Sequence, residues 1–104
     1  PGSISGQLYD MMMSQAYDYG YKDYFMGAGD RKIRFAGHGL GLELDEFPFI
    51  AKGQTLALEK GMMIALEPKV VFPEKGVVGI ENTLLVTDNG LESLTTFSDK
   101  ITIL

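Results

Sequence analysis

Cysteine is absent from this sequence, which excludes disulfide bonds and thiolate metal sites. A bound metal ion would therefore need histidine and carboxylate ligands, which suit Mn, Co, Fe(II) or Zn. Histidine is also scarce, because His38 is the only one in the chain. Metal chemistry in this protein would have to combine His38 with aspartate or glutamate side chains.

Positive charge is in short supply as well. Nine basic residues stand against fourteen acidic ones, and the net charge is -5. Arg31, Lys32 and Arg34 form only a short local cluster, whereas phosphate contacts need many clustered basic side chains. We therefore expect no nucleic-acid partner.

Long apolar runs are missing too, and none approaches the roughly 20 residues of a membrane span. We therefore expect no membrane partner. No signal peptide is visible, so we expect a cytoplasmic location. The chain begins at Pro1 without an initiator methionine, and we expect the natural N-terminus to be missing.

Apolar spacing predicts one helix and then a sheet. Residues 3–19 have helical periodicity, with Ile4, Leu8, Met11, Met12, Gln15 and Tyr19 on one face. Ser3 or Ser5 could cap its start and Gly20 could end it. Residues 62–72 and 77–87 are β-rich, Pro73-Glu74-Lys75-Gly76 is a turn sequence, and residues 91–94 follow a second turn. This order predicts an α+β fold.

Three ionisable residues stand where a packed core is expected. His38 lies between glycines in Gly37-His38-Gly39, and Glu67 and Glu81 each interrupt an apolar strand. Taken singly, the histidine is more often structural or exposed, and each glutamate is more often at a wet strand edge. Adjacent strands lie about 5 Å apart, however, so Glu67 and Glu81 could share a cation.

Other acidic residues have plainer interpretations. Glu43, Asp45 and Glu46 lie near a glycine-rich turn, and their default interpretation is solvated loop charge. Asp10, Asp18 and Asp23 fit the wet side of the helix and its exit.

Four motifs in one order resemble a known family. The segments Gly37–Glu43, Glu46–Pro48, Gly61–Pro68 and Gly79–Thr83, followed by Val86-Thr87, are similar to the pita-bread metallopeptidases. These include methionine aminopeptidase, Xaa-Pro aminopeptidase, prolidase and creatinase. The spacing from His38 to Glu67 and Glu81 is closest to the Xaa-Pro dipeptidase branch. The resemblance implies half of a pita-bread fold, with residues 1–104 as the C-terminal part of the catalytic domain and the N-terminal part absent.

The same resemblance implies a site for two divalent metal ions held by two aspartates, one histidine and two glutamates. His38 and Glu67 would be ligands, and Glu81 would bridge the ions. The ions would polarise a peptide carbonyl and activate a water molecule, and Glu67 would also take the proton of that water. Histidine ligates as neutral imidazole, so binding should weaken in acid.

Three departures from the family pattern affect activity. The two aspartate ligands belong to the absent N-terminal part. Asp45 stands where the family has a second histidine that contacts substrate, and a carboxylate cannot donate a hydrogen bond to an oxyanion. Gly79 replaces a frequent arginine, and Asn82 replaces a frequent aspartate.

Two functions follow as hypotheses. The first is a fragment of a dinuclear-metal aminopeptidase or Xaa-Pro dipeptidase-like hydrolase acting on peptides, inactive alone because its metal site is incomplete or empty. The alternative is a non-hydrolytic member of the same fold, either creatinase-like or a binding module. A half domain would expose an apolar face, so we also expect a homodimer.

Overall fold

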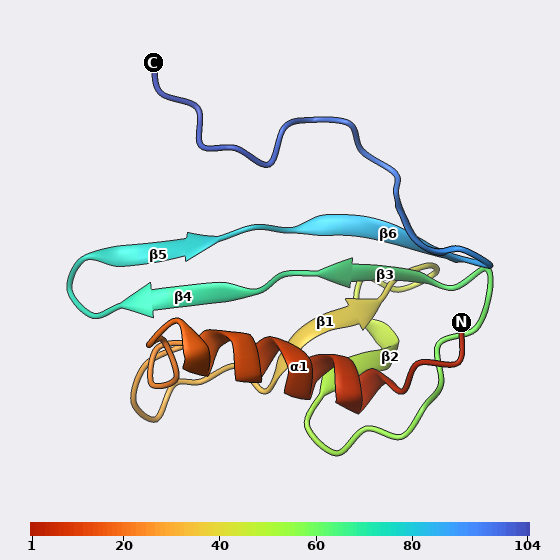
Figure 1. The fold of residues 1–104 in the computed structure, drawn as a ribbon, viewed down its shortest axis with the longest axis horizontal. Helices are drawn as coiled ribbons and strands as arrows, with labels where there is room; N and C mark the ends of the chain where they lie inside the picture. Colours follow the sequence, from red (N-terminus) through yellow and green to blue (C-terminus); the bar gives the residue numbers. More distant parts are fainter.

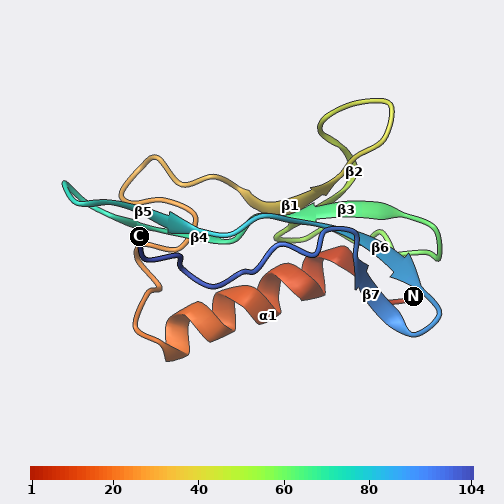
Figure 2. The same cartoon turned by 90° about the horizontal axis from the view of Figure 1, so that it is seen from above.

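The structure, a computed structural model, describes residues 1–104 as one helix and seven strands. The elements are α1 (Ser5–Asp18), β1 (Phe35–Gly39), β2 (Glu46–Ala51), β3 (Met63–Leu66), β4 (Lys69–Phe72), β5 (Gly76–Gly79), β6 (Asn82–Thr87) and β7 (Gly90–Ser93). Five strands form an antiparallel sheet in the order β2-β1-β3-β6-β7, and β4 pairs with β5. Helix α1 covers one face of the sheet (Figures 1 and 2). The predicted α+β architecture is confirmed.

The start of α1 differs from the predicted serine cap. Ile4 is the N-cap residue, and no side chain caps the helix. Instead, the backbone N–H groups of Ser5 and Gly6 donate to the carbonyl oxygens of Leu56 and Gln54, at 2.9 and 3.2 Å. Backbone carbonyl groups of the chain after β2 therefore accept hydrogen bonds from the first N–H groups of the helix, a role that a capping serine hydroxyl would otherwise have.

The end of α1 agrees with the prediction that Gly20 stops the helix. Gly20 has a φ of 82° and donates its N–H to Tyr17, while Tyr21 donates to Ala16 at 2.7 Å. This pair of bonds is a Schellman motif, in which glycine supplies the left-handed residue at low cost.

The predicted buried face of α1 was partly wrong. Tyr9 and Ala16 are the buried apolar residues of the helix, whereas Met11 and Tyr19 are 61% and 78% exposed. The reason is a close approach at Gly6, where an added Cβ would lie 2.4 Å from the Gln54 carbonyl oxygen. That contact turns the Gly6 side of the helix toward the protein.

Strands β1 and β2 were not recognised in the sequence, where the glycine-rich segment 36–48 obscured them. Their pairing contains register shifts on both sides of the Gly37–His38 step. Such irregularities break the strict alternation of apolar and polar residues on which a strand prediction depends.

Strands β3 to β6 form one long hairpin with a gap in its middle. The register that pairs Leu66 with Asn82 in β3–β6 also pairs Lys69 with Gly79 in β4–β5. Between them, Ile80 donates its N–H to the Pro68 carbonyl oxygen at 3.2 Å. Proline has no N–H of its own to return the bond, so the ladder is interrupted there. The turn predicted at residues 73–76 is confirmed at the tip of this hairpin.

The core lies between α1 and the sheet. Its largest fully buried apolar side chains are Met26, Ile50 and Ile64. Ile64 belongs to the central strand β3, whose next residue, Ala65, points to the opposite face because side chains alternate along a strand. His38 pairs with Ala65, so the opposite face is the one that carries the histidine.

Candidate metal centre

His38 lies in β1, the strand between β2 and β3. Its neighbours Gly37 and Gly39 cannot carry side chains, because an added Cβ would lie 2.6 Å from the Ala65 carbonyl oxygen and 2.4 Å from that of Phe47, respectively. The flanking glycines thus let both neighbouring strands approach the histidine backbone closely. The imidazole is buried, with 5% of the residue exposed.

Hydrogen bonding fixes the orientation of the His38 ring. Its Nδ1 lies 2.9 Å from the Gly39 carbonyl oxygen, which can only accept a hydrogen bond, so Nδ1 carries the hydrogen. In the neutral ring this leaves the lone pair on Nε2. Phe35 packs against the ring edge at a centroid distance of 6.0 Å. Nε2 is therefore presented as a metal ligand or as a hydrogen-bond acceptor.

Glu67 and Glu81 occupy the gap in the long hairpin. Counting one step beyond Leu66 and Asn82 places the two glutamates opposite each other. The prediction that each lies inside a strand needs correction, since Glu67 follows β3 and Glu81 precedes β6. Glu67 is anchored by its backbone N–H, which donates to the Ala36 carbonyl oxygen at 2.9 Å.

The structure brings all three predicted residues together. One ligand atom from each of His38, Glu67 and Glu81 lies within 4.8 Å of the other two. The histidine is buried, Glu67 is half-buried and Glu81 is exposed. A nitrogen and carboxylate oxygens at this spacing are a donor set that fits Mn, Co, Fe(II) or Zn. Three side chains distant in sequence could thus hold a divalent ion.

Asp45 also approaches the histidine. Its Oδ1 lies 3.1 Å from Nε2 of His38, closer than the 4.0 Å from Nε2 to Glu67. Its side chain remains 52% exposed, because it stands on the loop that joins β1 to β2. Sequence reasoning treated Asp45 by default as loop charge and placed it beside the site only through the family resemblance.

The remaining acidic candidates lie outside the cluster. Glu43 and Glu46 interact locally, since the Glu43 N–H donates to the Glu46 carboxylate at 3.1 Å. Asp18 ends α1, and Asp23 lies in the turns that follow it. None of these four belongs to the cluster of possible metal ligands.

Lys69 lines the same hollow as the glutamates and was missed in the sequence. The hollow is bordered by Glu67, Lys69, Gly79, Ile80 and Glu81. A signal was available, because residues two apart in an extended chain share a face, and Lys69 is two residues beyond Glu67.

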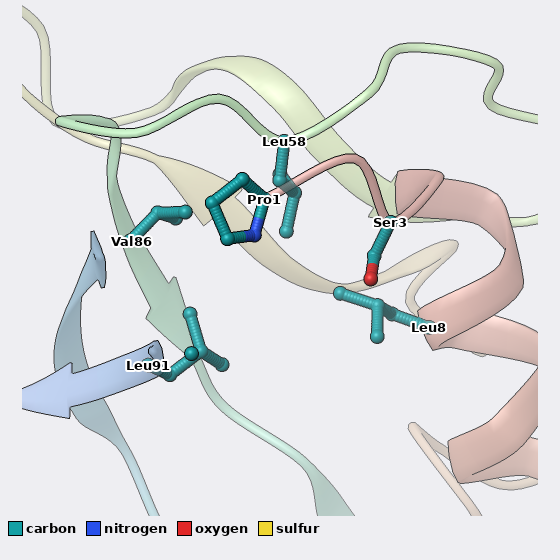
Figure 3. A pocket seen from close by; sticks show the side chains of 7 residues that line it. Pro1, Ser3, Leu8, Leu58, Val86 and Leu91 are labelled. Carbon is teal, nitrogen blue, oxygen red and sulfur yellow. The ribbon is translucent and has the colours of Figure 1, made fainter. Parts of the chain in front are cut away.

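A separate apolar pocket lies near the start of α1 and has no such chemistry. Figure 3 shows its lining, in which Ser3 supplies the only polar side chain. The cavity measures about 80 Å³ and is bordered by Pro1, Ser3, Leu8, Leu58, Val86, Gly90 and Leu91. It holds none of the metal-ligand candidates.

The sequence and the fold of this chain are similar to those of known proteins. The model of Metallopeptidase family M24 matches residues 1–88. A Xaa-Pro dipeptidase of Pyrococcus furiosus is 39% identical over 95 residues, which cover 91% of this chain and 25% of that protein. The solved prolidase from Pyrococcus furiosus superposes with a TM-score of 0.83 at 38% identity, over 94% of this chain and 27% of the other.

A Xaa-Pro dipeptidase from Bacillus anthracis gives a TM-score of 0.86 at 31% identity, over 99% of this chain and 27% of its own. The architecture is therefore that of a pita-bread domain, in part. The chain spans about a quarter of the length of these relatives.

Proposed function

This chain belongs to metallopeptidase family M24, and on that premise we propose that residues 1–104 are the C-terminal part of the catalytic domain of a metal-dependent Xaa-Pro dipeptidase. Its relatives include proteins named Xaa-Pro dipeptidase. The observation that carries the proposal is the meeting of His38, Glu67 and Glu81 within 4.8 Å.

The residues present fit a metal centre. His38 would bind one ion through Nε2, because Nδ1 is committed to the Gly39 carbonyl. Glu67 would be a second ligand, and Glu81, directly opposite, would bridge two ions. When bound, the ions would polarise the scissile carbonyl and activate a water molecule. The candidate ions are Mn, Co, Fe and Zn, which suit histidine and carboxylate ligands.

The chain's own groups have further tasks in this proposal. Glu67 accepts the proton of the attacking water, since a carboxylate near the site is a suitable general base. Its anchored backbone limits how far the carboxylate can move, which favours a fixed geometry for proton transfer. The buried His38 imidazole packs against Phe35 and keeps one orientation, which fixes the position of its Nε2 as a ligand.

Asp45 supports the second candidate, a non-hydrolytic or creatinase-like member of the fold. Its carboxylate lies 3.1 Å from the His38 Nε2, where it cannot donate a hydrogen bond to an oxyanion. The retention of His38, Glu67 and Glu81 favours hydrolysis. We therefore keep hydrolysis as the leading function, with Asp45 in the place of the substrate-contacting histidine of the family.

Residues 1–104 by themselves should be inactive, because three ligands do not complete a site that the family builds from five.

We also propose that this chain forms a homodimer in isolation. Twenty large apolar side chains are exposed, against ten buried hydrophobic residues. Such an excess of exposed apolar surface favours association. A cytoplasmic location is part of the same proposal, and cell fractionation tests it.

Hydrolysis of the dipeptide Ala-Pro tests the proposed function. The assay uses the full-length protein that carries these residues, loaded in turn with Mn²⁺, Co²⁺ and Zn²⁺. Wild type should release proline, and Glu81→Gln should lose about a hundredfold or more, because even residues that only support metal ligands cost 10- to 100-fold. Metal-loaded wild type that releases no proline would favour the non-hydrolytic alternative. Glu92→Gln, on exposed β7, is the matched control.

A further inference from the structure

Lys69 lies directly across the β4–β5 ladder from Gly79. Two positions away in the same hairpin stand Glu67 and Glu81, on the same face, because alternate residues of a strand point the same way. One hollow is lined by Glu67, Glu81 and Lys69 together. A lysine thus lines the same hollow as two residues of the proposed metal centre.

The absence of a side chain at Gly79 makes room for this lysine. A Cβ added at Gly79 would lie 2.8 Å from the Lys69 Cβ, a distance that real Cβ atoms do not adopt. With the backbone in these positions, a side chain at position 79 would therefore clash with the side chain of Lys69. Only one of the two facing positions can carry a long side chain over this part of the site.

Lys69 is half-buried and makes no ion pair. The one lysine that forms an ion pair is Lys60, with Asp88. A lysine that lines the same hollow as two glutamates without pairing to them is available for another anion. Ions held by the two glutamates would neutralise them and would leave the charge of Lys69 without a counter-charge in this hollow.

From these observations we propose that Lys69 binds the free α-carboxylate of a short peptide substrate and so determines specificity for dipeptides. This inference rests on the proposed function. Residues two apart in a strand are separated by about 6.6 Å, and a lysine side chain is long and flexible. The free carboxylate of a dipeptide follows the scissile bond by a single residue, about 3.8 Å between Cα atoms. A long side chain can therefore span the two-residue step toward the scissile bond, where a dipeptide places a carboxylate and a longer peptide would place an uncharged amide.

Calorimetric binding of L-proline and L-prolinamide to the Mn²⁺-loaded full-length protein tests this inference. L-Proline carries the free carboxylate, and prolinamide lacks it. Lys69→Met should weaken L-proline binding roughly tenfold or more, as expected for the loss of a charge-assisted hydrogen bond. Prolinamide should bind wild type and Lys69→Met equally. Lys75→Met, in the exposed turn of the same hairpin, is the control and should change nothing.

A charge-swapped variant provides an independent result. In Lys69→Gly/Gly79→Arg the cation moves to the facing strand, and the 2.8 Å obstacle to a side chain at position 79 is removed. L-Proline binding should recover at least in part relative to Lys69→Met. Equal L-proline affinity in wild type, Lys69→Met and Lys75→Met would overturn the role of Lys69. A wild-type protein that fails to bind Mn²⁺ would instead overturn the proposed function, so the two failures are distinguishable.

Discussion

Glu67 and Glu81 lie opposite each other in the gap between two strand ladders, β3–β6 and β4–β5, which share one register. The gap arises at Pro68, which has no N–H to donate across the hairpin. Extended strands continue on both sides of the gap, so the two carboxylates are held opposite each other by ladders above and below. Paired strands on both sides of the gap suit a metal centre, because ligands that are already held in place need little reorganisation when an ion binds.

The close packing around His38 predicts a severe effect of Gly39→Ala. An added Cβ would lie 2.4 Å from the Phe47 carbonyl oxygen, and backbone atoms cannot yield as a side chain would. We expect a loss of about 2–3 kcal/mol in the free energy of unfolding, measured by urea denaturation.

Gly20→Ala is the matched control for that change. Its φ of 82° disfavours alanine, but nothing lies within 4 Å of the new Cβ. The expected loss is about 1 kcal/mol. A Gly39→Ala protein at least as stable as Gly20→Ala would contradict the packing described for β1.

Asp45→His in the full-length protein separates the two candidate functions. A histidine at this position can donate a hydrogen bond where a carboxylate cannot, so kcat for Ala-Pro should rise, by about tenfold or more if the new donor reaches the oxyanion. Steady-state kinetics with Mn²⁺ bound measures the effect. An unchanged or lower kcat would mean that Asp45 does not limit hydrolysis. Glu43→His, on the same loop, controls for a general effect of the substitution.

Sedimentation equilibrium of residues 1–104 tests the proposed homodimer. At high micromolar concentration we expect twice the 11.4 kDa mass of the chain, because so many apolar side chains are exposed. Val78→Asp alters one of these side chains, 60% exposed on β5, and shows whether that strand takes part in the interface. A wild-type sample that stays at the monomer mass throughout would refute the homodimer.

Parts of the fold were readable in the sequence because their signals are local. Gly20 ended the helix as expected, and the Pro73–Gly76 turn joined β4 to β5. The buried face of α1 was not readable, because it depends on the contact between Gly6 and Gln54, which are distant in sequence.

The candidate site shows the same division. Glu67 and Glu81 stand out because each interrupts an apolar run, and the hairpin register explains why they meet. The contact between Asp45 and His38 depends on the path of the β1–β2 loop, which neither spacing nor composition specifies. Lys69 differs, because its two-residue spacing from Glu67 was visible in the sequence, whereas the room that Gly79 leaves for it on the facing strand depends on the hairpin register.

Calorimetric titration of residues 1–104 with Mn²⁺ tests the central claim most directly, because it needs neither substrate nor the remaining ligands. Wild type should bind one ion weakly through His38, Glu67 and Glu81, and Glu81→Ala should weaken binding about tenfold or more, while Glu92→Ala should not. Affinity should also fall in acid, as protons compete for the imidazole. Equal Mn²⁺ affinity in wild type, Glu81→Ala and Glu92→Ala would contradict the assignment of the metal centre, and tight binding of two ions would contradict its incompleteness in this chain.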